Sequence, residues 1–197
     1  MMDVGDAASN PMIRNALGDS FPASPEVTLR LCREAGIDRY SHVLHLGAGV
    51  GTVCQLLIET FGCKATGVVM LEPLLQHCVY EDERVEYLHA KMTEPPFEPG
   101  TFTHVLIECR CIAHPDLEAV FAAAKQMLAP GGQLIVNEPV LSSGSSLPKI
   151  IGRMVGETRI NEVLQQRTAM EIGIEIATAG FDMVESRSEP EVTERLH

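Results

Sequence analysis

The sequence has no tryptophan, and only 5% of its residues are aromatic. It contains no run of about 18 apolar residues, the length that a membrane-spanning helix needs, so we expect no membrane contact. A formal net charge of −12 argues against a nucleic-acid or anionic-membrane surface, because both carry dense negative charge. Residues 1–10 lack the basic region and apolar core of a signal peptide, which favours a cytoplasmic protein.

Several motifs of catalysis and metal binding are also missing. The six cysteines are scattered, and the C-x-C spacing of the one close pair, Cys109 and Cys111, fits no zinc site. There is no G-x-S-x-G or H-E-x-x-H motif and no paired-carboxylate pattern. We therefore expect reduced thiols that serve in packing and no resident metal ion.

The stretch HVLHLGAGVG, from His42 to Gly51, organises the rest of the chain. Its short apolar run ends in the glycines Gly47, Gly49 and Gly51, and a helical pattern opens at Thr52. This order predicts a buried parallel strand, a tight turn and a helix N-terminus. Glycine accepts a positive φ and lets a ligand approach the backbone, while the helix end offers N–H groups.

Strand and helix patterns alternate along most of the chain. The alternation predicts one domain over residues 24–197, a parallel sheet with helices on both faces, and an arm or lid over residues 1–23. The glycines then lie beyond the carboxyl ends of the strands, where such folds bind ligands. The predicted strands are 42–46, 65–70, 85–89, 104–108, 133–137 and 182–186, and the predicted helices are 25–35, 53–61, 73–78, 115–127 and 150–179.

Six motifs, in order and spacing, resemble those of the class I S-adenosylmethionine-dependent methyltransferases. They are VLHLGAGVG, ATGVVMLEP, VEYLHAKMTEPPF, GTFTHVLIE, LAPGGQLIVNEP and AGFDMVE, within residues 25–190. The resemblance implies a three-layer, Rossmann-like doubly wound α/β fold, with S-adenosylmethionine as cofactor at Gly47, Gly49 and Gly51. The family has a seventh, antiparallel strand, for which only residues 187–197 remain here. An open strand edge is normally covered, so we expect a homo- or hetero-oligomer.

Three positions depart from the family pattern. The family places acids at the ends of the first and second strands and after the third, where this chain has His45, Val69 and Lys91. Each lost charged hydrogen bond to a ligand costs roughly 1.5–3 kcal/mol, which weakens binding about ten- to a hundredfold. Glu72, three residues beyond Val69, is the acid that remains for the ribose. These exchanges count against ordinary cofactor binding.

Basic and histidine side chains are predicted around the same pocket. We expect Arg110, Lys91 and His89 to hold a substrate bearing a carboxylate, phosphate or sulfate. The candidate catalytic acids and bases are His45, His114 and Glu108. Each also has a structural interpretation: the two histidines as core or helix-entry residues, and Glu108 as the ion-pair partner of Arg110.

Three functions stay open on the sequence. The first is a lyase- or cyclase-type enzyme that works without S-adenosylmethionine, because elimination and cyclisation need a base and a stabilised leaving group rather than a cofactor. The second is a small-molecule methyltransferase whose glycine turn holds the methionine part of the cofactor while Glu72 helps to hold the ribose. The third is a non-catalytic subunit that stabilises a partner. The histidine-lined pocket favours the first.

Overall fold

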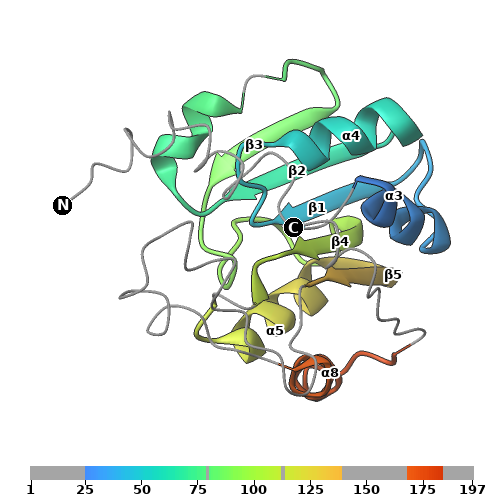
Figure 1. Cartoon of the computed structure of the whole chain (residues 1–197), viewed down its shortest axis with the longest axis vertical. Coiled ribbons are helices and arrows are strands. Elements are labelled where there is room, and N and C mark those ends of the chain that lie inside the picture. Colours follow the sequence, from blue (N-terminus) through green and yellow to red (C-terminus); the bar gives the residue numbers. More distant parts are fainter. Residues whose placement is uncertain (1–24, 79, 112–113, 139–167, 184–197) are drawn as a thin grey trace, which may run out of the picture.

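The computed structural model describes residues 25–78, 80–111, 114–138 and 168–183 (Figure 1). The arm expected over residues 1–23 and most of the helix expected over 150–179 lie outside these residues. In chain order the elements are α3 (Pro25–Glu34), β1 (His42–Leu46), α4 (Thr52–Phe61), β2 (Lys64–Val69), the 3-10 helix η2 (Glu72–His77), β3 (Val85–His89), β4 (Phe102–Glu108), α5 (Leu117–Met127), β5 (Leu128–Asn137) and α8 (Ala169–Thr178).

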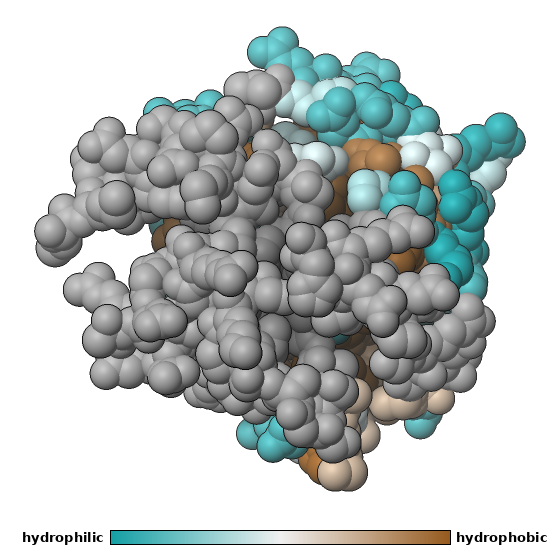
Figure 2. All heavy atoms as spheres, in the orientation of Figure 1, coloured by the Kyte–Doolittle hydropathy of each residue, from teal (hydrophilic) through white to brown (hydrophobic). Residues whose placement is uncertain are grey.

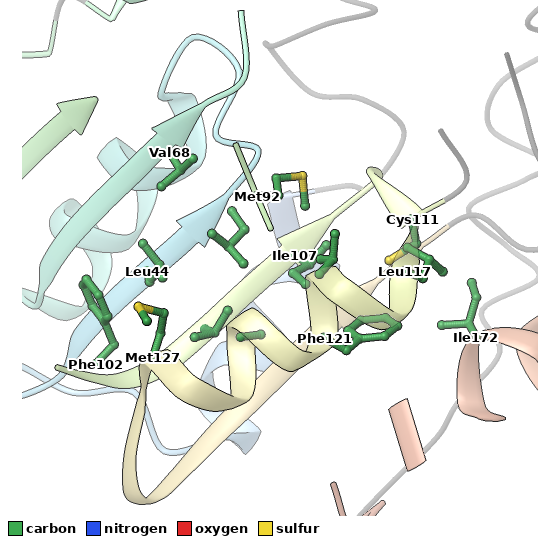
Figure 3. Close-up of a cluster of buried hydrophobic side chains, with 14 residues drawn as sticks. Leu44, Val68, Met92, Phe102, Ile107, Cys111, Leu117, Phe121, Met127 and Ile172 are labelled. Carbon is green, nitrogen blue, oxygen red and sulfur yellow. The ribbon is translucent and has the colours of Figure 1, made fainter. Parts of the chain in front are cut away.

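The five strands form one parallel sheet in the order β3-β2-β1-β4-β5, with β1 at its centre. Successive residues of a strand point to opposite faces. Leu44 and Leu46 therefore pack with α5 and α8 in one hydrophobic cluster (Figure 3). Val43 packs with α3 and α4 on the other face. This confirms the predicted three-layer, doubly wound α/β fold.

Most element boundaries agree with the sequence pattern, and the differences have local causes. β5 begins five residues earlier than the strand predicted over 133–137 and contains an irregularity, because Phe102 pairs with Leu128 whereas His104 pairs with Gln133. β2 begins and ends one residue earlier than predicted, and β4 begins two residues earlier. Of the strand predicted over 182–186, residues 182–183 are not in a strand and the rest lie outside the described residues.

The helix predicted to begin at Pro115 begins instead at Leu117, because Asp116 caps it. The Asp116 carboxylate accepts a hydrogen bond from the Ala119 N–H at 2.9 Å. We expect Asp116→Ala to lower the free energy of unfolding by about 1 kcal/mol, the usual cost of a lost N-cap. Urea denaturation checks this, with Asp116→Asn as the control that keeps a capping oxygen. Equal losses in both variants would contradict the capping role.

The outward face of α8 is apolar. Met170 is 74% exposed and Ile174 is 59% exposed, and apolar atoms are visible at the bottom of Figure 2, where α8 lies. Exposed apolar surface of this kind is typical of contact surfaces. It agrees with the expected oligomer, which stays a prediction. In the part of the chain that the structure describes, no helix has the length and apolar character to cross a membrane.

Candidate functional site

The three glycines connect β1 to α4 at the carboxyl edge of the sheet (Figure 1). All have a positive φ: 85° at Gly47, 59° at Gly49 and 87° at Gly51. The N–H groups of Gly47 and Ala48 donate to the Val68 carbonyl at 3.0 and 2.8 Å, which ties the turn to the end of β2. Because glycine adopts a positive φ without steric cost, this backbone path explains all three glycines.

Arg110 and Tyr87 occupy the space beside two of these glycines. A Cβ atom on Gly47 would lie 2.6 Å from Cγ of Arg110. One on Gly51 would lie 2.6 Å from the Tyr87 ring. Arg110 Nε donates to the Gly47 carbonyl at 2.9 Å, and the Tyr87 hydroxyl donates to the Gly51 carbonyl at 3.1 Å. Gly51, expected to approach a cofactor, therefore also makes room for a side chain of the protein itself.

His45 is enclosed beneath the glycine turn and is only 3% exposed. Its Nδ1 lies 3.9 Å from Cys54 Sγ in α4, on the side of the sheet that α4 covers. Its Nε2 is buried and has no hydrogen-bond partner in the described structure. Burial and the charge of Arg110 lower the pKa of His45 to about 3. The ring is therefore neutral near pH 7 and suits hydrogen bonding to a ligand better than proton donation.

Glu108 is held in a buried polar network that joins three elements. Its Oε1 accepts hydrogen bonds from the Thr28 hydroxyl in α3 and from Asn137 Nδ2 in β5, the latter at 2.8 Å. Burial raises the pKa of Glu108, while these two hydrogen bonds and the charge of Arg110 lower it. Both donors hold one carboxylate oxygen, so the network ties α3 to the end of the sheet.

We expect Thr28→Val to lower the free energy of unfolding by about 1–3 kcal/mol, because it removes a donor to a buried carboxylate without changing the side-chain shape. Urea denaturation at pH 7 checks this. Thr28→Ser keeps the hydroxyl and serves as the control. A Thr28→Val protein as stable as the wild type would mean that the hydroxyl contributes nothing to the network.

Glu138, directly after β5, is the site residue that the sequence reasoning missed. Its Oε1 accepts the N–H groups of Arg110 and Cys111 at 2.6 and 2.8 Å. Its Oε2 is buried and has no hydrogen-bond partner among the residues described. Burial raises the pKa of Glu138 to about 7, although hydrogen bonds from the two N–H groups and from the Cys111 side chain, together with the charge of Arg110, lower it. An acid immediately after a predicted parallel strand, at the ligand-binding edge, was the available signal.

The other predicted binding residues lie on the surface. His89 ends β3 and is exposed. Lys91 is also exposed, and its Nζ pairs with the Glu94 carboxylate at 3.1 Å. Glu72 begins η2 and is exposed as well. Their assignment to substrate or ribose stays a prediction, whereas Arg110 lies close enough to His45 and Glu108 for its charge to lower the pKa of both.

His114 lies just before α5 in a defined hydrogen-bonding arrangement. Its Nδ1 accepts the Asp116 N–H at 3.2 Å. A neutral ring in this arrangement carries its proton on Nε2. The catalytic role of His114 stays a prediction. Among the described residues, no group of three or more His, Cys, Asp or Glu side chains is placed to hold a metal ion.

The chain is similar to several methyltransferases. Residues 43–132 match a family model described as a methyltransferase domain. A sarcosine/dimethylglycine N-methyltransferase of Halorhodospira halochloris is 25% identical over 171 residues, which are 82% of this chain and 61% of that protein. A sterol 24-C-methyltransferase of Schizosaccharomyces pombe is 30% identical over 127 residues, which are 60% of this chain and 34% of that protein. The chain thus spans less than two thirds of these relatives.

The likeness extends to solved structures. Phosphoethanolamine N-methyltransferase 2 of Haemonchus contortus, in complex with S-adenosyl-L-methionine, superposes with a TM-score of 0.75 at 19% identity. The superposition covers 100% of this chain and 48% of that one. At this identity the likeness concerns the fold, so the function has to be argued from the site.

Proposed function

Since this chain has the class I methyltransferase fold, we propose that it binds S-adenosylmethionine and transfers a methyl group to a small molecule. The two curated relatives described above are named as methyltransferases, which supports the second of the three functions considered on the sequence. These two relatives do not support elimination or cyclisation without the cofactor, the function that the histidine-lined pocket favoured. One fold hosts many chemistries, so the proposal depends on particular residues of the site.

The position of Arg110 against the glycine turn carries the proposal. Arg110 Nε donates to the Gly47 carbonyl at 2.9 Å, which sets the guanidinium beside the turn. The amino-acid end of S-adenosylmethionine bears a carboxylate, and a guanidinium is the side chain best suited to bind one. The glycines let the same ligand end approach the backbone closely.

The residues at the turn fit the methionine end of the cofactor better than its adenosine end. His45 adds a buried Nε2 that has no partner in the described structure and can make a hydrogen bond to a ligand. At the adenosine end, Val69 is fully buried and offers no carboxylate for the ribose. Each missing charged hydrogen bond weakens binding about tenfold or more, so we expect a modest affinity.

The chain's own contribution to methyl transfer is alignment. When bound, the cofactor supplies an electrophilic methyl group on a sulfonium. Arg110 and the glycine turn would fix the position of its methionine part. Holding two reactants in line supplies much of the rate enhancement of a displacement reaction.

Calorimetric titration with S-adenosylmethionine tests this function. We expect a Kd in the micromolar range for the wild type and binding at least tenfold weaker for Arg110→Ala. Arg39→Ala is the matched control, because exposed Arg39 precedes β1 at the opposite edge of the sheet and stacks on Tyr40. Absence of binding to the wild type at millimolar concentration would reject the function, and an unaffected Arg110→Ala would reject the assigned contact.

A further inference from the structure

We propose that Glu138 is the group that binds an amine or ammonium nitrogen in this site, through its Oε2 atom. The proposal rests on the proposed function, because it names the ligand chemistry that the same site holds. The nitrogen belongs either to the methyl acceptor or to the amino-acid end of the cofactor. Both sources present N–H groups that a carboxylate oxygen can accept.

The two oxygens of the Glu138 carboxyl group have different surroundings. Oε1 accepts two backbone N–H groups, from Arg110 and Cys111, at 2.6 and 2.8 Å. Oε2 is buried and, in the structure as described, accepts none. Buried polar atoms nearly always have a partner, so a lone buried acceptor in a site needs an explanation. A ligand that donates a hydrogen bond to Oε2 provides one.

The backbone around Arg110 holds this carboxyl group next to the glycine turn. Cys109 adopts a left-handed conformation with a φ of 55°, which is uncommon for a residue with a side chain. The next two N–H groups then converge on Glu138 Oε1 and fix its position. The side chain of the same Arg110 reaches the Gly47 carbonyl. A single residue therefore connects Glu138 to the turn expected to hold the cofactor.

The charges of the described site favour a nitrogen cation at Glu138. The guanidinium of Arg110 lowers the pKa of three neighbouring groups, which are the carboxyl groups of Glu108 and Glu138 and the neutral ring of His45. With both carboxylates ionised, the cluster has one more negative than positive charge. A buried charge is stable only when an opposite charge compensates it. The excess negative charge therefore favours an ammonium group at Oε2 and disfavours an anionic group of the ligand there.

The acidity of Glu138 agrees with a role in binding a titrating nitrogen. Burial raises its pKa to about 7, which lets the carboxyl group exchange a proton with a bound amine near neutral pH. The Arg110 guanidinium suits an anionic group of the same ligand. A ligand that carries an amine and an acid together satisfies both residues.

Glu138→Gln tests the proposal, because it keeps an oxygen for the two N–H groups and puts an amide donor in place of Oε2. We would titrate S-adenosylhomocysteine, which has the amino-acid end, and 5′-methylthioadenosine, which lacks it, into both proteins at pH 8. If the nitrogen is the cofactor's, the variant binds the first at least tenfold more weakly and the second unchanged. Glu118→Gln, at an exposed position on α5, is the control.

If the nitrogen is the acceptor's, the variant binds both nucleosides normally. It then loses at least tenfold in affinity for sarcosine or ethanolamine, titrated with S-adenosylhomocysteine saturating. Equal affinities of wild type and Glu138→Gln for both nucleosides and both amines overturn the proposal. Glu138 then has only the structural role of accepting the two backbone N–H groups. Failure of the wild type to bind S-adenosylhomocysteine at all rejects the proposed function instead.

Discussion

Replacement of Gly51 by alanine is expected to lower the free energy of unfolding by about 2–5 kcal/mol. Two costs add. The φ of 87° is unfavourable for any residue with a Cβ atom. The new Cβ would also lie 2.6 Å from the Tyr87 ring, so the ring or the turn has to move. Urea denaturation followed by circular dichroism measures the loss, and because the turn moves we also expect weaker binding of S-adenosylmethionine.

Gly36 offers the matched control for the backbone cost alone. It has a φ of 75°, but no atom lies within 4 Å of the position that its Cβ would take. Gly36→Ala should therefore cost only about 1–2 kcal/mol. Adding Tyr87→Leu to Gly51→Ala shortens the obstructing side chain and should recover part of the difference. If Gly51→Ala is no more costly than Gly36→Ala, Tyr87 does not constrain the turn.

The sequence predicts the fold well because its signals are local. The strand His42–Leu46 is bounded by a turn, and four of its five residues are buried in register with two neighbouring strands, so its limits were predicted correctly. The start of α5 was predicted wrongly at Pro115 because two N-terminal signals compete there, and the Asp116 side chain decides between them through a hydrogen bond. The sequence pattern alone does not decide whether Pro115 or Asp116 sets the start of the helix.

The site was predicted less completely, because its contacts join residues far apart in the chain. The glycine turn, His45 and Arg110 were expected at one edge of the sheet, and the structure brings them together. The partner of Gly51 was not foreseen, since Tyr87 reaches it from β3. Glu138 was missed for the same reason: its two hydrogen bonds link the end of β5 to the segment that follows β4.

The charges and contacts of the histidine and basic residues in the structure differ from those expected on the sequence. On the sequence they indicate a basic pocket for an anion. In the structure, burial makes His45 neutral, and Lys91 is exposed and paired with Glu94. Arg110 faces two buried carboxylates, Glu108 and Glu138. A residue type thus predicts a charge only when its burial is known.

Glu138→Gln is expected to gain stability relative to the wild type, by up to about 3 kcal/mol, as the pH rises from 5 to 8. The pKa of Glu138 is raised to about 7 in the folded protein, against about 4.3 in an unfolded chain. The folded state therefore binds this proton more tightly than the unfolded state. The protonated Glu138 contributes its full stabilisation below about pH 4, and this stabilisation is lost as the pH rises to about 7. Glutamine has no such proton, so the loss affects only the wild type.

Urea denaturation of both proteins at unit steps of pH measures this difference directly. The pH dependence from Glu108 and the exposed acids is common to both proteins and cancels, and Glu118→Gln is measured alongside as the control for the loss of an exposed carboxylate. A stability difference that stays constant, or a Glu138→Gln protein that loses stability relative to the wild type as the pH rises, would mean that the carboxylate is already ionised and compensated at pH 5. The negative charge of Glu138 would then already be balanced within the protein and would not favour a ligand cation. This measurement on the protein without ligand therefore also tests the premise of the ammonium site.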